Sequence, residues 1–156
     1  MLSKIIVGFD RLVGRRFYRL HVHVYRWTRG IIGSRSPAGP MLLLTTVGRK
    51  SGQRRTTPLL YMPDGERFIV VGSNGGRPQP PAWLLNLTAT PLVEVQAGRH
   101  KHQADARVLT EDEKTVMWPI LAQHYKGWSE YQKLTDRELN VVALTPRSGA
   151  TAGIGA

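Results

Sequence analysis

The stretch that most limits how this chain can fold lies between Met41 and Met62, where two apolar runs flank a short cationic segment. Met41 to Val47 and Thr56 to Met62 can both form strands, and the eight residues between them hold two glycines, one serine and four cations. Glycines let the backbone turn tightly and leave amides free to face a ligand. The stretch therefore predicts a β-hairpin with a cationic tip.

The four cations of this tip are Arg49, Lys50, Arg54 and Arg55. Like charges at such close range repel one another, which costs stability unless an anion lies among them. The tip is therefore a candidate anion site. The alternative is a solvated turn that carries charge only for solubility, and the stretch by itself fits both interpretations.

Charge is unevenly distributed along the 156 residues. Residues 1–63 hold 12 Lys and Arg against the single acid Asp10, whereas residues 64–156 hold ten of each sign, so the whole surplus of +11 lies in the first part. A basic face of this kind suits a polyanionic small molecule, an anionic membrane surface or nucleic acid.

The length and the 41% hydrophobic content fit one domain with a real core, and the lack of cysteine excludes disulfides and thiolate sites.

Residues 3–29 predict a long amphipathic helix. Apolar side chains recur there at spacings of three and four, with arginines nearly opposite them. The apolar stripe consists of Ile6, Phe9, Val13, Phe17, Leu20, Val24 and Trp27. No apolar run reaches the roughly 20 residues that a membrane span needs. The pattern is typical of a helix at a membrane surface and also of one packed on its own domain.

Four further strands are expected after the first hairpin, at residues 67–72, 92–97, 100–108 and 139–145. Residues 41–73 should then form an antiparallel meander. Short helices are expected at residues 82–87 and within 126–136, and a longer one at 110–125, where Thr110 and Glu113 form a capping box and Pro119 should introduce a kink. Six strands with short antiparallel connections predict a mainly β (α+β) fold, either a small barrel or a sandwich.

This pattern divides the chain into a basic N-terminal helix at 1–30, a Gly- and Pro-rich linker at 31–40, a barrel domain at 41–146 and a tail at 147–156. From Pro146 onward the composition predicts disorder.

Two later segments could line a ligand site. Residues 73–76 (SNGG) form a Gly-rich loop before the short helix, and such loops can offer backbone amides to an anion or a ring carbonyl. Tyr125, Trp128 and Tyr131 are spaced by three, which places them on one helix face suited to a flat apolar substrate. Each feature also fits a purely structural role, as a turn and as core aromatics.

Common catalytic motifs are absent: there is no serine nucleophile elbow, no phosphate-binding loop of the nucleotide hydrolases and no zinc-protease motif. His21 and His23 face different directions on a helix, and His100 and His102 lack a third ligand, so no metal site is expected. If the chain is an enzyme, a bound organic cofactor should therefore carry the difficult step.

A series of ordered motifs covers about residues 40–145: residues 42–53 (LLLTTVGRKSGQ), 55–60, 72–76 (GSNGG), 81–87 (PAWLLNL), Pro91 and the pair Tyr131-Gln132. With these motifs the chain resembles the deazaflavin-dependent nitroreductase family, actinobacterial quinone reductases that use reduced coenzyme F420. The resemblance implies a six-stranded antiparallel split β-barrel related to FMN-binding barrels. It also implies hydride transfer from reduced F420 to a menaquinone-like quinone or a nitro-aromatic acceptor.

The resemblance further implies roles for individual residues. Arg49, Lys50, Ser51 and Arg55 would hold the phosphate and oligoglutamate tail, for which charge-assisted bonds from Arg and Lys are suited. The residues that would border the ring are Thr56, Thr57, Pro58, Leu59, Leu60, Val71, Gly72, Ser73 and Asn74. Ala82, Trp83 and Asn86 would pack on its other parts, and Leu84 and Leu85 are also expected to bind the coenzyme. Tyr125, Trp128 and Tyr131 would face the acceptor, and Tyr125, Tyr131 and Ser73 are the catalytic candidates.

Two positions depart from the family pattern. Trp128 stands where a tyrosine is expected, which removes a phenol on the substrate side, and Asn74 stands where a lysine can occur, which removes a cation near the ring. Family members carry a variable N-terminal helix associated with membranes, and menaquinone is dissolved in the bilayer. Residues 3–29 are thus expected to meet an anionic membrane surface, and the protein to be cytoplasmic or peripheral on the inner face of the membrane.

Three alternatives stay open. The charge of +11 suggests nucleic-acid binding, although no recognised nucleic-acid motif is present. The basic helix suggests a membrane-surface module without catalysis. A split barrel could also hold FMN or haem in place of F420. The sequence does not specify the oligomeric state.

Overall fold

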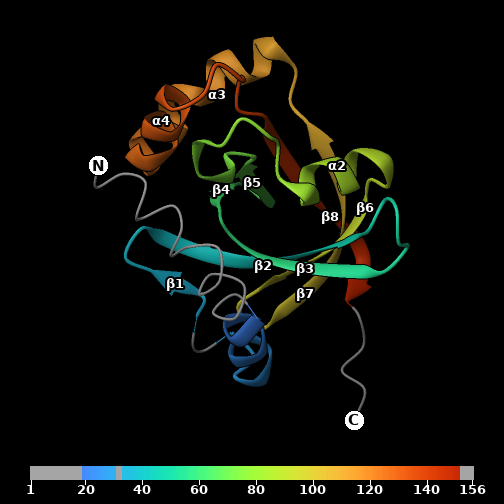
Figure 1. The fold of residues 1–156 in the computed structure, drawn as a ribbon. Helices are drawn as coiled ribbons and strands as arrows, with labels where there is room; N and C mark the ends of the chain where they lie inside the picture. The colour runs from blue at the N-terminus through green and yellow to red at the C-terminus, as the bar shows by residue number, and fades with distance from the viewer. Residues whose placement is uncertain (1–18, 31–32, 152–156) are drawn as a thin grey trace.

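Strand β2 (Gly39–Val47) is the middle of the sheet because it pairs antiparallel with β3 (Arg54–Leu60) and also with β6 (Leu92–Ala97). The computed structural model describes residues 19–30 and 33–151. In it the sheet continues from β6 through β7 (His100–Val108), β8 (Val141–Thr151) and β5 (Arg67–Val71) to β4 (Met62–Asp64), and it curls into a half-open barrel (Figure 1). The antiparallel α+β fold class expected from the sequence is confirmed.

The described residues form eight strands rather than the expected six. The two extra strands are β4 and β1 (Arg35–Ser36), which pairs with the start of β2 inside the stretch expected to be a linker. The meander expected over residues 41–73 is wrong, because β5 pairs with β8 and β4 and not with β3. The chain bends at Tyr61, so β3 and β4 follow one another in sequence but lie at opposite ends of the sheet.

The expected disorder from Pro146 onward is wrong as far as Thr151, because β8 continues to that residue beside β7. Ala104 pairs with Pro146, and the register shifts between there and the pairing of His102 with Thr151. Proline cannot donate to a ladder and is tolerated where pairing is irregular. The nine-residue β7 provides a pairing edge that the composition of the last residues does not reveal. Residues 152–156 lie outside the described range.

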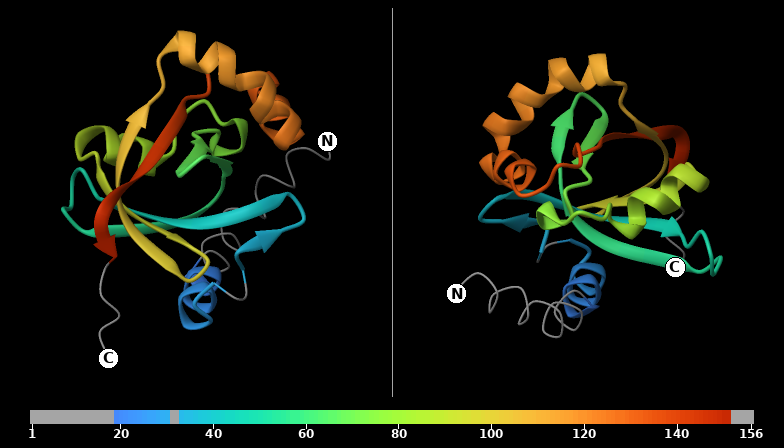
Figure 2. Two further views of the ribbon diagram at one scale, coloured as in Figure 1. Left: turned by 180° about the vertical axis from the view of Figure 1, so that it is seen from behind. Right: turned by 45° about the horizontal axis from the view of Figure 1, so that its top comes forward.

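Side chains on the two faces of the sheet pack against different layers. Leu42 and Leu44 point into the barrel, which α2 (Ala82–Ala89) closes with Trp83 and Leu87, whereas Leu43 points outward to Val22 and Tyr25. The interior thus has one apolar core, and the outer face of β5 and β8 has a second core beneath α3 (Glu111–His124) and α4 (Lys126–Lys133). Figures 1 and 2 show α3 and α4 at one end of the barrel and the N-terminal helix at the other. An unbroken Leu-Leu-Leu run fits a strand covered on both faces.

The N-terminal helix is described only over 19–27, and the rest of the predicted helix, residues 3–18, lies outside the described part. It docks on the sheet through Val22 and through Tyr25, which is fully buried. The Tyr25 hydroxyl donates to the Met41 carbonyl at 3.1 Å and accepts from the Gly98 amide at 2.7 Å. Leu20 and Trp27 on the opposite side are 60% and 86% exposed. The predicted apolar stripe therefore faces away from the barrel along this part of the helix.

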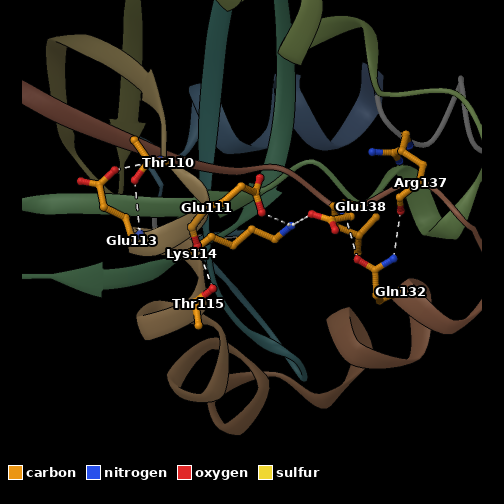
Figure 3. A network of polar contacts seen from close by, with 9 residues as sticks. Thr110, Glu111, Glu113, Lys114, Thr115, Gln132, Arg137 and Glu138 are labelled. Atoms are coloured by element: carbon orange, nitrogen blue, oxygen red, sulfur yellow. Dashed lines mark hydrogen bonds and ion pairs between the residues drawn. The ribbon is translucent and has the colours of Figure 1, made fainter.

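The predicted capping box at the start of α3 is confirmed: the Thr110 hydroxyl accepts from the Glu113 amide, and the Glu113 carboxylate accepts from the Thr110 amide at 2.8 Å. The helix continues through Pro119 to His124. Figure 3 shows this cap beside the contacts of Lys114 with Glu111 and Glu138.

The cap should make stability depend on acidity. The Arg107 guanidinium and the Thr110 amide, which both bond to the Glu113 carboxylate, lower its pKa from 4.5 to about 2. Because the folded-state pKa is the lower one, this stabilisation is complete above about pH 4.5 and disappears as the pH falls toward 2. Thermal unfolding of wild type and Glu113→Gln should therefore give a constant difference above pH 5 and converging midpoints at lower pH. A difference that persists unchanged at pH 2 would contradict this assignment.

Candidate functional site

The free edge of β3 is the first element of the site. β3 pairs with β2 along one edge, and no strand in the described part of the chain pairs with its other edge. Backbone N–H and C=O groups on an unpaired edge are available to a ligand. This edge carries residues 56–60, which the family resemblance places beside the coenzyme ring. β3 also contacts β5, and β5 leads into the loop at residues 72–77.

The pairing register sorts the side chains of β3 between the two faces of the sheet, because directly paired residues project to the same face. Leu59, Thr57 and Arg55 lie opposite Leu42, Leu44 and Thr46, and so share the face that lines the barrel. Thr56 and Pro58 lie opposite Thr45 and Leu43, on the face toward the N-terminal helix.

Thr56 therefore uses its side chain outside the barrel. Its hydroxyl accepts from Arg26 Nη2 at 2.8 Å and bonds to the Thr45 hydroxyl at 2.8 Å. Thr56 and Pro58 can thus border a ring at the strand edge only through their backbone. Leu60 packs against the second core.

The cations of the hairpin are also sorted by the register. Arg54 projects to the outer face and pairs with Glu94 at 3.0 Å. Arg49, Lys50 and Arg55 form no ion pair with any residue that the structure describes, and all three are exposed. Three uncompensated cations therefore surround one end of β3. This arrangement suits an anionic group with several charges.

The hairpin tip itself is a tight turn. The Gly48 amide donates to the Gln53 carbonyl at 2.7 Å, and the Gly52 amide donates to the Gly48 carbonyl at 2.8 Å. Gly52 has a φ of +68°, which favours glycine. The Ser51 hydroxyl accepts from the Gln53 amide at 3.2 Å, so one of its lone pairs is already engaged within the turn.

Asn86 connects this tip to α2. The side chain is 4% exposed, its Oδ1 accepts from the Arg49 amide at 3.1 Å, and its Nδ2 donates to the Thr46 hydroxyl at 3.1 Å. Asn86 therefore orients the backbone at Arg49, and a direct contact with the coenzyme stays a prediction. Trp83 and Leu84 are buried in the barrel core, whereas Ala82 is exposed and Leu85 is half-buried.

The loop that follows β5 is a further element of the candidate site, and its short 3-10 helix at Asn74–Gly76 contacts α4. Val71 and Gly72 are buried, and Ser73 and Asn74 are half-buried. Asn74 has a φ of +46°, and its Nδ2 donates to the Gln79 carbonyl at 2.8 Å, which closes the loop. The side chain of Asn74 thus stabilises the loop at the position where the family can have a lysine.

The three aromatic residues of the predicted acceptor side do not form one open face. Trp128 is only 3% exposed, lies in the second core, and stacks on His124 with ring centroids 6.2 Å apart. Tyr125 meets Trp128 edge-on at 5.4 Å, and both Tyr125 and Tyr131 are half-buried. Trp128 is therefore a core residue that supports Tyr125, and the two tyrosines remain the predicted contacts to the acceptor.

Gly127 determines where the Tyr125 ring lies, because a Cβ at this position would overlap the Cζ, Cε1 and hydroxyl atoms of that ring. In Gly127→Ala the ring must move while the helical backbone tolerates alanine well. We expect a slightly lower thermal stability, because the displaced ring loses packing against Trp128, together with a several-fold lower kcat/KM for the acceptor that the family resemblance implies. Equal kinetics in Gly127→Ala and wild type would show that the Tyr125 phenol has no contact with the acceptor.

The sequence reasoning missed Arg137, an arginine between α4 and β8. Its guanidinium donates from Nη1 to the Gly72 carbonyl at 3.1 Å and from Nη2 to the Ser73 carbonyl at 3.3 Å. No sequence pattern marks it, because it is one arginine in a polar turn whose partners are backbone atoms about 65 residues earlier.

Comparison with known proteins gives consistent results. The model of the family described as F420H(2)-dependent quinone reductase matches residues 17–146. The chain is 39% identical over 142 residues to an F420H(2)-dependent quinone reductase of Mycobacterium tuberculosis, covering 88% of this chain and 95% of that protein.

Two solved structures share the fold and a substantial part of the sequence. The F420-H2 dependent reductase FDR-A superimposes with a TM-score of 0.62 at 36% identity, over 67% of this chain and 93% of that chain. A structure described as a domain-swapped dimer gives a TM-score of 0.64 at 31% identity, over 80% of this chain and 96% of that chain. On this evidence of sequence and fold, the chain belongs to the F420H(2)-dependent quinone reductase family.

Proposed function

We propose that this chain transfers a hydride from reduced coenzyme F420 to a quinone, with the hairpin tip and the free edge of β3 holding the coenzyme. The observation that carries the assignment of the site is the group of three uncompensated cations, Arg49, Lys50 and Arg55, at the end of an unpaired strand edge. The family membership supports the reaction, and the donor chemistry of these side chains fits a phosphate and a chain of carboxylates.

The chain's own residues would bind, orient and shield the reactants. Arg49, Lys50 and Arg55 would hold the acidic tail, while Thr57 and Leu59 would border the ring from the barrel face of β3. When bound, reduced F420 supplies the hydride from its ring carbon.

The quinone needs a proton as well as a hydride on its way to a hydroquinone. Tyr125 and Tyr131 lie half-buried on the side opposite the hairpin, and we assign to their hydroxyls the donation of this proton or of a hydrogen bond to the quinone oxygen. The Ser73 hydroxyl, on the loop after β5, would be a second hydrogen-bond donor to the ring.

The test mixes the purified protein with reduced F420 and menadione, a soluble quinone, and follows the return of the oxidised chromophore by absorbance. Turnover that requires the protein is expected. FMN offered in place of F420 should neither bind tightly nor support the reaction. No turnover with menadione, with a longer menaquinone or with a nitro-aromatic acceptor would contradict the proposal.

We further propose that the N-terminal helix lies on an anionic membrane surface. Leu20, Val24 and Trp27 form a stripe on the side away from Val22 and Tyr25, and Leu20 and Trp27 are largely exposed. The side chain of Arg19, on one flank of the stripe, is also exposed, so apolar groups and a cation face outward together, whereas the Arg26 guanidinium donates to Thr56 on the sheet. Such a helix binds by burying its apolar face between acidic headgroups. Over the residues the structure describes, no helix is long and apolar enough to span a bilayer.

Flotation with vesicles that contain phosphatidylglycerol should recover the protein. Leu20→Ser with Trp27→Ser should reduce the bound fraction at least about tenfold, because both exposed side chains would bury apolar area in the membrane surface. Val116→Ser with Ile120→Ser is the matched control, since it removes two exposed apolar side chains from α3. Equal loss in both double variants would assign the binding to general surface hydrophobicity and contradict the proposal.

A further inference from the structure

Arg137 lies in the segment between α4 and β8 and reaches the loop formed by residues 72–77. Besides the bonds from its guanidinium to Gly72 and Ser73, Nη2 also donates to the Arg77 carbonyl at 3.3 Å. Three backbone carbonyls of one loop therefore converge on one side chain. The buried Nε of Arg137 has no hydrogen-bond partner among the described residues, and no described carboxylate forms an ion pair with it.

The backbone of Arg137 is itself held in place. Gln132 Nε2 donates to the Arg137 carbonyl at 2.9 Å, and Gln132 Oε1 accepts from the Leu139 amide at 2.9 Å (Figure 3). On the other side of the segment, Lys114 pairs with Glu138 at 2.9 Å. The segment is thus braced from α3 and α4, and Arg137 extends from a fixed base.

The loop also rests directly on this segment. Gly76 is buried with a φ of +76°, and a Cβ there would come within 2.8 Å of the Tyr131 carbonyl oxygen and 2.9 Å of Leu134 Cβ. Only glycine allows this approach. Arg137 and Gly76 together fix the loop against the end of α4.

The carbonyl bonds to Arg137 determine where the amides of the loop point. In a trans peptide the N–H of one residue points opposite to the C=O of the residue before it. Because the Gly72 and Ser73 carbonyls point toward Arg137, the amides of Ser73 and Asn74 point away from it. Neither amide donates to a residue in the described part of the chain.

We propose that Arg137 is a positioning residue of the coenzyme site: it holds the carbonyls of Gly72 and Ser73 so that the amides of Ser73 and Asn74 face a carbonyl oxygen of the coenzyme ring. The inference rests on the proposed function, which places the ring beside this loop. Burial lowers the pKa of Arg137 from its ordinary value, but a guanidinium keeps its charge at all physiological pH values. The Arg137 guanidinium has no partner carboxylate among the described residues, so its positive charge would also stabilise electron density on the carbonyl oxygen of the ring.

The test compares Arg137→Lys and Arg137→Gln with wild type by two measurements that need no turnover. Hydrogen exchange of the unliganded protein reports whether residues 72–77 loosen. A titration with oxidised F420 gives its affinity and the absorption maximum of the bound chromophore. Arg54→Gln is the control, because it removes an arginine charge from the outer face of β3.

Both Arg137 variants should show at least about tenfold faster exchange at the Gly76 and Arg77 amides, which donate to the Ser73 and Asn74 carbonyls within the loop. They should also show about tenfold weaker F420 binding and a bound absorption maximum shifted toward that of free F420, as expected for the loss of one to two hydrogen bonds. Lysine keeps the charge but lacks the planar fork, so it should not restore wild-type behaviour. The far-UV circular dichroism spectrum and the exchange of β2 should stay unchanged.

Each other outcome overturns the inference. Wild-type exchange at residues 72–77 in Arg137→Gln would show that Arg137 does not hold the loop. Faster exchange with unchanged affinity and spectrum would show that the loop does not face the ring. Complete restoration by lysine would assign the effect to charge alone. If wild type itself fails to bind F420, the proposed function fails, which the titration of wild type reveals before any variant is compared.

Discussion

Replacing Lys50 and Arg55 together by alanine should weaken F420 binding about 100-fold and leave the fold intact. Each cation would lose a charge-assisted bond to the phosphate or a carboxylate of the tail, and two such bonds contribute about 3 kcal/mol. Neither side chain forms an ion pair among the described residues, and both are exposed, so the folded state loses little without them. A titration with oxidised F420 monitored by fluorescence measures the change directly.

Arg54→Ala is the control for this experiment because it removes a cation from the adjacent residue on the other face of the sheet, where Glu94 already balances the charge. It should change the F420 affinity less than threefold. The dependence on salt should also differ, with the double variant losing most of the steep decline in affinity that wild type shows as salt is added. Equal effects from Arg54→Ala and Arg55→Ala would show that only the net charge of the hairpin matters, and unchanged affinity in the double variant would refute the anion site.

Gly30→Ala should detach the N-terminal helix from the barrel and destabilise the protein by about 3 kcal/mol. Gly30 has a φ of +79°, and a Cβ there would overlap the backbone of Gly98, so neither partner can move aside through a side chain. The cost combines strain in the left-handed region with loss of the Tyr25 contacts. Chemical denaturation measures the free energy of unfolding, and hydrogen exchange should become fast over residues 19–30.

Gly65→Ala separates these two contributions. Gly65 has a φ of +58°, but a Cβ there would meet no atom within 4 Å, so this variant carries only the backbone strain of about 1 kcal/mol. Tyr25→Phe removes only the hydrogen bonds of the hydroxyl with Met41, Gln96 and Gly98 and should have an intermediate effect, with faster exchange limited to the helix. Equal losses in Gly30→Ala and Gly65→Ala would show that close packing on Gly98 is unimportant.

Several elements of the fold follow from the local sequence. The first hairpin, the hairpin of residues 92–108 and the capping box of α3 lie where the apolar runs, the Gly-Arg turn and the Thr-x-x-Glu pattern predict them. Each depends on residues that are near neighbours in the chain, so short-range physical rules describe it well. The pairing of β5 with β8 joins residues about 75 apart, and no local pattern predicts it.

The N-terminal helix shows that an apolar pattern does not by itself reveal which side of a helix packs on the domain. The periodicity of Leu20, Val24 and Trp27 predicts an apolar face, and such a face usually packs on the domain. In the structure Val22 and Tyr25 make that contact, because the Tyr25 hydroxyl satisfies backbone groups at the end of β6 that an aliphatic side chain would leave unpaired. The apolar face is therefore left outward, and only the docked helix reveals this.

The sequence by itself determined the family and the cationic hairpin, because ordered motifs and charge patterns can be read from neighbouring residues. It also predicted Tyr125 and Tyr131 as contacts to the acceptor. Only the tertiary structure decided which of these side chains share a face. Strand register placed Arg55 on the barrel side and Arg54 on the outer side. Packing placed Trp128 in the core. Two segments far apart in the chain approach one another, and this contact brought Arg137 to the loop formed by residues 72–77. The physical reason is that a side chain's surroundings are set by which strands and helices meet, and this depends on the packing of the whole chain.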